Sequence, residues 1–74
     1  MTRLPSLTGH QIIKALGKAG FQVLRQRSSH VYLKHTDGRA TVVPVHQGEC
    51  VGTGLLRKII RDAELSRDEF IDLL

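Results

Sequence analysis

Apolar residues recur at helical spacing in the first part of the chain. Thr8 followed three positions later by Gln11 forms a capping box, in which a hydroxyl and an amide side chain each bind a backbone group left free at a helix start. Gly20 fits the stop position, because glycine readily adopts the left-handed conformation that ends many helices. The pattern predicts a helix between these signals, with an apolar side made of Ile12, Ile13, Leu16 and Ala19.

From residue 21 onward the apolar residues follow strand-like patterns. The segments "FQVLRQR" (21–27) and "HVYLKH" (30–35) are rich in β-branched, aromatic and other strand-compatible residues, and "RATVVPV" (39–45) follows the hairpin turn signal Asp37-Gly38. Pro44 indicates that the third strand ends there or lies at a sheet edge. We therefore expect three antiparallel strands in sequence order.

The second of these strands divides its side chains between two faces. By alternation, Val31 and Leu33 point one way, whereas His30, Tyr32 and Lys34 point the other way. One face can therefore pack against a core, while the other displays a histidine, a tyrosine and a lysine.

Two further helices are expected after the strands. The residues "GTG" at 52–54 open the first of them, and Ser66 with Glu69 repeats the capping box before a short helix with Phe70, Leu73 and Leu74. The apolar face of the longer helix holds Leu56, Ile59, Ile60 and Ala63, and the opposite side holds Arg57, Lys58 and Arg61.

The order of these elements predicts an α+β fold in one domain over residues 1–74. A helix comes first, then a three-stranded antiparallel sheet, a second helix and a short extra C-terminal helix. Two helices on one face of such a sheet would bury that face and leave the other accessible.

The charge of the chain points to phosphate-bearing partners. Its 11 lysine and arginine residues outnumber 7 aspartate and glutamate residues, and the sequence pI is about 9.9. Such a surplus favours RNA or DNA as a partner, although a soluble basic protein without a nucleic-acid partner has the same composition.

Cysteine usage and the opening residues predict a cytosolic protein. Cys50 is the only cysteine, so no intrachain disulfide can form. The start "MTRLPSLTGH" lacks the apolar run of a signal peptide, and no stretch approaches the length of a membrane span. His46 and Cys50 are too few to bind a metal ion, so we expect no metal and no cofactor, and a small, partly buried Cys50.

Four segments together resemble the HicA family of bacterial toxins, also called YcfA-like proteins. They are "IIKALGKAGF", "RSSHVYLKH", "DGRATVVPVH" and "GTGLLRKIIRDAELS", and their order and spacing cover nearly the whole chain. The resemblance implies a fold like that of double-stranded-RNA-binding domains, α-β-β-β-α. It also implies endoribonuclease action on mRNA, with His30 in the catalytic position and a HicB-type antitoxin that covers the active surface.

Two residues depart from the family pattern. Ser28 stands where glycine is usual, so we expect strain if the turn requires a positive φ, although two short polar residues can still form a turn. Glu64 stands where glycine often follows the second helix, which predicts a changed exit of the chain from that helix.

The chemistry of RNA cleavage suits His30. The 2′-hydroxyl of RNA can attack the adjacent phosphorus without a metal, so an enzyme must move protons and stabilise phosphoryl charge. Histidine suits the proton steps because its ordinary pKa lies near neutrality. Judged by the residues alone, a surface histidine at a turn is the competing interpretation; the resemblance favours catalysis.

The other histidines have weaker claims. His46 follows the adjacent strand and is the candidate second acid or base, but a loop histidine without a role is an equal alternative. His35 lies at the hairpin tip and points with Val31 and Leu33, and His10 lies in the first helical turn. Neither is assigned a function.

The basic and aromatic residues near His30 are candidate RNA contacts. Tyr32 can stack on a base or be half-buried in the strand, and the cationic helix face can meet phosphates or simply be solvated. The candidate RNA-binding residues are Arg25, Arg27, Ser29, Tyr32, Lys34, Arg57, Lys58 and Arg61.

Three functions are consistent with these patterns. The first is an mRNA interferase of a type II toxin–antitoxin system, a metal-independent endoribonuclease that inhibits translation. The second is a non-catalytic RNA-binding module of similar fold, and the third is a protein whose main task is to bind a protein partner.

Overall fold

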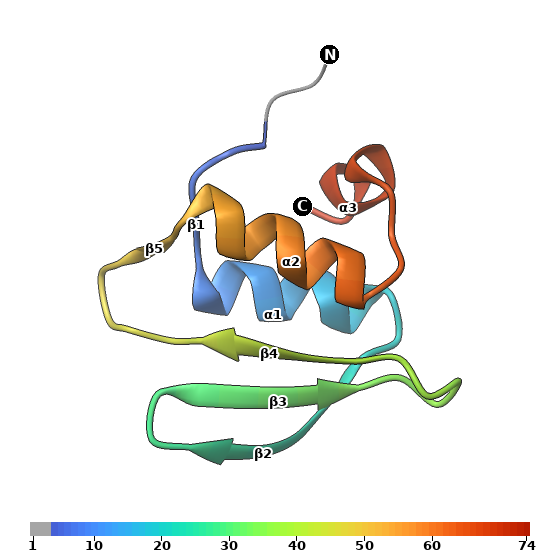
Figure 1. The fold of residues 1–74 in the computed structure, drawn as a ribbon, viewed down its shortest axis with the longest axis horizontal. Coiled ribbons are helices and arrows are strands. Elements are labelled where there is room, and N and C mark those ends of the chain that lie inside the picture. Colours follow the sequence, from blue (N-terminus) through green and yellow to red (C-terminus); the bar gives the residue numbers. More distant parts are fainter. Residues whose placement is uncertain (1–3) are drawn as a thin grey trace.

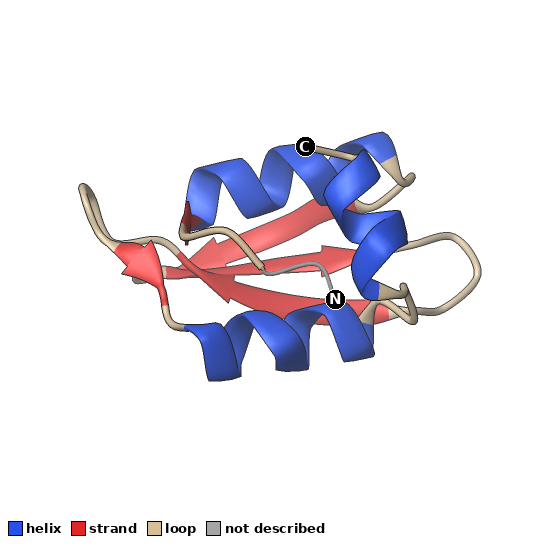
Figure 2. Ribbon diagram, turned by 90° about the horizontal axis from the view of Figure 1, so that it is seen from above, coloured by secondary structure: helices blue, strands red, loops and turns tan. Residues whose placement is uncertain are grey.

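The computed structural model describes residues 4–74 and has an α+β architecture. Its main sheet is antiparallel with strand order β2-β3-β4, formed by β2 (Gln22–Arg27), β3 (His30–Lys34) and β4 (Ala40–Pro44). Figure 1 shows the two long helices, α1 (Gly9–Lys18) and α2 (Thr53–Asp62), nearest to β4, with β2 farthest from them. Seen from above in Figure 2, these helices run side by side along the sheet, and the short third helix lies at one end. The expected fold class is confirmed.

Helix α1 begins and ends as its sequence predicts. The backbone N–H of Gln11 donates to Thr8 Oγ1 at 3.3 Å, and the backbone N–H of Thr8 donates to Gln11 Oε1 at 2.9 Å. At the other end Gly20 has a φ of 99°, and the N–H of Phe21 donates to the carbonyl of Leu16 at 3.0 Å. Both ends are therefore closed by local hydrogen bonds.

Helix α2 ends in the same way, without a glycine. Glu64 has a φ of 56°, its N–H donates to the Arg61 carbonyl at 3.0 Å, and the N–H of Leu65 donates to the Ile60 carbonyl at 3.2 Å. These are the two bonds of a Schellman motif. The changed exit that we expected at Glu64 was wrong, because the glutamate itself takes the left-handed conformation.

The short helix α3 (Arg67–Asp72) has the predicted capping box. The N–H of Glu69 donates to Ser66 Oγ at 3.0 Å, and the N–H of Ser66 donates to Glu69 Oε1 at 2.8 Å. Phe70 is completely buried, whereas Leu74, expected in the same short helix, lies beyond the helix end and is 47% exposed. The prediction for Leu74 was wrong, because the helix ends before this residue.

A second, two-stranded sheet was not predicted. Strand β1 (Leu7–Thr8) pairs with β5 (Cys50–Val51), with Leu7 opposite Val51 and Thr8 opposite Cys50. This pairing fastens the loop after β4 to the start of α1. Pro44 is the last residue of the edge strand β4, as its sequence predicted.

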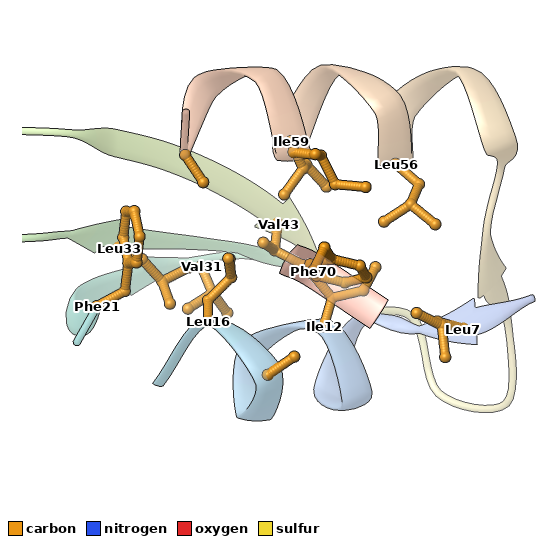
Figure 3. Packing of buried hydrophobic residues seen from close by; sticks show 13 residues of the cluster. Leu7, Ile12, Leu16, Phe21, Val31, Leu33, Val43, Leu56, Ile59 and Phe70 are labelled. Atoms are coloured by element: carbon orange, nitrogen blue, oxygen red, sulfur yellow. The ribbon is translucent and has the colours of Figure 1, made fainter. Parts of the chain in front are cut away.

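The core lies between the two long helices, α3 and the inner face of the sheet (Figure 3). From β3, Val31 and Leu33 point into it, as alternation predicted, and Val43 joins them from β4. Strand β2 extends past this layer, since all six of its residues are exposed. The largest fully buried side chains are Phe70, Ile12, Leu16, Leu33, Leu56, Ile59 and Val43.

The hairpin between β3 and β4 contacts the C-terminal ends of both α1 and α2. Arg39 donates from Nη1 to the Ala63 carbonyl at 2.6 Å, and its Nε lies 2.8 Å from Asp37 Oδ2. His35 is half-buried and packs edge-on against Phe21, with ring centroids 5.3 Å apart. His35 therefore belongs to the packing of the fold, on the side that alternation predicted. Among the described residues, no helix is long and apolar enough to cross a membrane.

Candidate functional site

His30 stands on the face of the sheet that the helices leave open. It is exposed at the start of β3, where burial alternates from His30 through Val31 to Lys34. Residues directly opposite in an antiparallel pair share a face, and His30 lies opposite Pro44 while Tyr32 lies opposite Val42. The open face of β3 and β4 therefore combines a histidine and a tyrosine with two half-buried apolar side chains.

The arginines of β2 flank the same residues. Arg27 pairs with His30 and Arg25 pairs with Tyr32, and a β-bulge interrupts the register between Val23 and Arg25. The guanidinium carbon of Arg25 lies 4.9 Å from the centre of the Tyr32 ring, within the range of a cation–π contact. Both arginines lie on the open face beside His30, as the sequence analysis supposed.

The turn that presents His30 is formed by the two serines. Ser28 has a φ of 54°, so the strain expected from a residue other than glycine is present. Gln26 Nε2 donates to the Ser28 carbonyl at 3.2 Å, and the Val45 N–H donates to the Ser29 carbonyl at 2.6 Å. These bonds fix the turn, and His30 follows it directly.

His30 also lines a hollow of about 440 Å³ between the open sheet face, the 46–52 loop and the first turns of α2. His46, the candidate second acid or base, lines the same hollow. The structure therefore brings together two histidines that are far apart in the sequence, along with Glu49 and Lys58. Its apolar lining consists of Val42, Pro44, Val51 and Leu55.

The cations of α2 are divided between two positions. Lys58 lines the hollow, and its Nζ lies 3.0 Å from Asp62 Oδ2, which also accepts a hydrogen bond from Thr41 Oγ1 at 3.1 Å. Arg57 and Arg61 are exposed but do not line the hollow. Lys58 therefore lines the same hollow as His30, whereas Arg57 and Arg61 do not.

The remaining candidates lie outside the hollow. Lys34 is exposed on the open face at the far end of β3, opposite Ala40, and Ser29 is half-buried in the turn. His10 is exposed in the first turn of α1, where the sequence placed it. Lys34 therefore adds positive charge to the open face, but none of these residues lines the hollow.

Glu49 and Leu55 are among the lining residues that the sequence analysis missed. Glu49 belongs to the loop held by β1 and β5, a ladder too short to leave a pattern in the sequence. Leu55 did leave a signal, because it is an apolar residue of α2 outside the buried stripe and is 39% exposed.

Cys50 is exposed, so the prediction of a partly buried thiol was wrong. Its place in β5, directly opposite Thr8, carries it to the rim of the hollow instead of the core. Within residues 4–74, no three His, Cys, Asp or Glu side chains gather closely enough to hold a metal ion.

The site can hold an anionic strand and move protons. Two imidazoles supply nitrogen atoms that can accept or donate a proton. Lys58 and the β2 arginines supply positive charge around them, which favours a phosphodiester backbone. Tyr32, half-buried under Arg25, offers a ring face.

Comparison with known proteins places the chain in a family. The family model described as the HicA toxin of bacterial toxin–antitoxin systems matches residues 9–65, which run from the start of α1 to just past the end of α2. No curated protein matches the chain. The match covers both long helices, the main sheet and the hollow beside His30. The chain belongs to the HicA family of toxins, which act in toxin–antitoxin pairs with a HicB antitoxin.

Proposed function

We propose that this HicA toxin is an mRNA interferase, a metal-independent endoribonuclease that uses His30 to move a proton during cleavage. The observation that carries the proposal is the exposure of His30 at a hollow that also holds His46 and Lys58. The toxin acts as one domain over residues 1–74, in the cytoplasm where mRNA is translated.

The proposed reaction uses a nucleophile that RNA itself carries. The 2′-oxygen forms a bond to the adjacent phosphorus, and the bond from phosphorus to the 5′-oxygen breaks. One imidazole accepts the proton of the 2′-hydroxyl, and another group gives a proton to the departing 5′-oxygen. His30 takes one of these roles, and His46 is the candidate for the other. Lys58 and Arg27 stabilise the negative charge that builds on the phosphoryl oxygens.

This mechanism predicts which strands the toxin cuts. RNA should be cleaved in the presence of a chelator and leave 2′,3′-cyclic phosphate ends, whereas the same sequence with 2′-O-methyl riboses should stay intact. Gel analysis of end-labelled strands, followed by mass spectrometry of the products, measures both results. Cleavage of the 2′-O-methyl strand would rule out the 2′-hydroxyl as nucleophile.

The antitoxin is proposed to inhibit by covering the His30 face. Strand β2 supports this, because Leu24 is 64% exposed and lines a second hollow together with Tyr32 and Val42 of the open face, next to Arg25. Exposed apolar side chains rimmed by charge are typical of a protein-binding surface. A partner seated there would exclude RNA by steric blocking.

A further inference from the structure

We propose that the hollow beside His30 is a subsite for one unpaired nucleobase of the RNA strand. The inference rests on the proposed function for its substrate, RNA, and adds a binding site next to the reacting phosphate. It also identifies Leu55 as a residue that shapes this subsite.

The hollow has the lining that a base requires. Val42 and Pro44 project from the open face of β4, and Leu55 faces them from α2. Leu55 is 39% exposed, whereas its neighbour Leu56 in the core is 1% exposed. Leu55 therefore contributes little to the core. Its side chain offers an apolar wall against which the flat face of a base can pack.

Polar groups at the rim can read the edge of that base. Glu49 offers carboxylate oxygens that accept hydrogen bonds, and Lys58 offers N–H groups that donate them. Lys58 is held at the rim by Asp62, which is itself held by the buried Thr41. An apolar pocket with a few fixed polar groups is the usual design of a small-ligand site.

The place of the hollow suits the base next to the cleaved bond. His30 is both a lining residue and the proposed catalytic residue, so a phosphate within its reach has a neighbouring base at the mouth of the hollow. The Arg25 and Tyr32 pair lies on the same open face and can stack a second base. An RNA strand held at both positions would pass close to His30, which lines the hollow and lies two residues from Tyr32 on the same strand face.

Only an unpaired base can enter such a site. In a duplex the base faces are stacked and the pairing edges are occupied, so neither is free to enter the hollow. The toxin should therefore prefer single-stranded RNA, even though its fold resembles that of domains that bind duplexes by shape.

The test measures binding without cleavage. His30→Ala toxin is titrated against a labelled single-stranded RNA, the same RNA in a duplex, and inorganic polyphosphate, a polyanion without bases. The measurements are repeated with Leu55→Ala added, and with Leu74→Ala added as a control, since Leu74 is also exposed but does not line the hollow. Fluorescence anisotropy gives the RNA affinities, and calorimetry gives that of polyphosphate.

Leu55→Ala should lower the affinity for single-stranded RNA by roughly three- to tenfold, because the substitution removes apolar contact area with the base. The affinities for duplex RNA and polyphosphate should stay unchanged, and Leu74→Ala should change none of the three affinities.

If Leu55→Ala leaves the affinity for single-stranded RNA unchanged, the proposal is overturned, and the hollow would instead bind an apolar side chain of a protein partner. An equal loss for polyphosphate, or no RNA binding at all, would overturn it too. Failure of wild-type toxin to cut an RNA that it binds would contradict only the proposed function.

Discussion

Two residues other than glycine hold left-handed backbone conformations, Ser28 with a φ of 54° and Glu64 with a φ of 56°. Both stand where the family pattern favours glycine. A side chain in this conformation brings its Cβ close to the carbonyl oxygen that follows, at a cost of about 1–2 kcal/mol. The chain tolerates this cost because local hydrogen bonds close both turns.

Replacing Glu64 by glycine should stabilise the protein. Relief of the strained conformation outweighs the extra freedom of glycine in the unfolded chain, so we expect the free energy of unfolding to rise by about 1 kcal/mol. Urea denaturation of Glu64→Gly measures the change. Gly20→Ala is the matched control at the end of α1, with a φ of 99° and His35 Nε2 only 2.8 Å from the added Cβ, and should destabilise. A less stable Glu64→Gly would contradict the strain at this position.

At the residue scale, alternation alone places His30 correctly, because a strand with one buried face fixes the direction of every side chain in it. The same reasoning fails for Cys50. Its exposure depends on the pairing of β5 with β1, and a ladder of two residues on each side is too short to show a period in the sequence.

The hairpin between β3 and β4 is stabilised by charge. The pKa of Asp37 is lowered chiefly by the hydrogen bond from the Arg39 backbone N–H, with further help from the Arg39 guanidinium and His35. The pKa of Glu69 is lowered in the same way by the Ser66 backbone N–H in the capping box of α3. In both elements the ionised carboxylate is favoured in the folded state.

Stability should therefore fall in acid. A carboxyl group with a lowered folded-state pKa contributes stability above its unfolded pKa of about 4, and this contribution is lost as the pH falls through the folded value. Urea denaturation in steps from neutral pH to about pH 3 measures the decline. Asp37→Asn should be less stable near neutrality and show a shallower decline. If the stability of Asp37→Asn falls with pH as steeply as that of the wild type, Asp37 does not contribute to the loss of stability in acid.

At the element scale, capping boxes locate α1 and α3, the helical spacing of apolar residues locates α2, and strand-like segments locate the main strands, because all these signals are local. The end of α2 shows the limit of this reasoning. The family pattern led us to expect an altered exit at Glu64, but hydrogen bonds to the Arg61 and Ile60 carbonyls impose the usual geometry on the residue. The bonds of the helix end outweigh the preference of a single residue.

The candidate site exists only at the scale of the whole molecule. It is assembled from the start of β3, the end of β4, the 46–52 loop and α2, which are separate in the sequence. Sequence reasoning could name His30, His46 and Lys58 but could not predict that they line one hollow. It also could not separate Lys58 from Arg57 and Arg61, because charge on a helix does not show which flank faces the sheet.

If the antitoxin covers the open face, antitoxin and RNA should compete for the toxin. We expect a HicB-type antitoxin to displace labelled RNA from His30→Ala toxin once the two proteins are present in equal amounts. Fluorescence anisotropy follows the release. A complex that contains toxin, antitoxin and RNA together would contradict steric blocking and point to an inhibitory surface elsewhere.

The most direct measurement of the toxin's chemistry compares wild type with His30→Ala on a long single-stranded mRNA in the presence of a chelator. If His30 moves a proton in the reaction, the wild type cuts and the variant is slower by at least about a hundredfold, since general acid–base groups contribute on that order or more. Circular dichroism should remain close to that of the wild type, because His30 is exposed and makes no contact in the core, and the variant should still bind RNA. Equal cutting by both proteins would contradict a catalytic His30, and intact RNA bound by both would indicate a non-catalytic RNA-binding module.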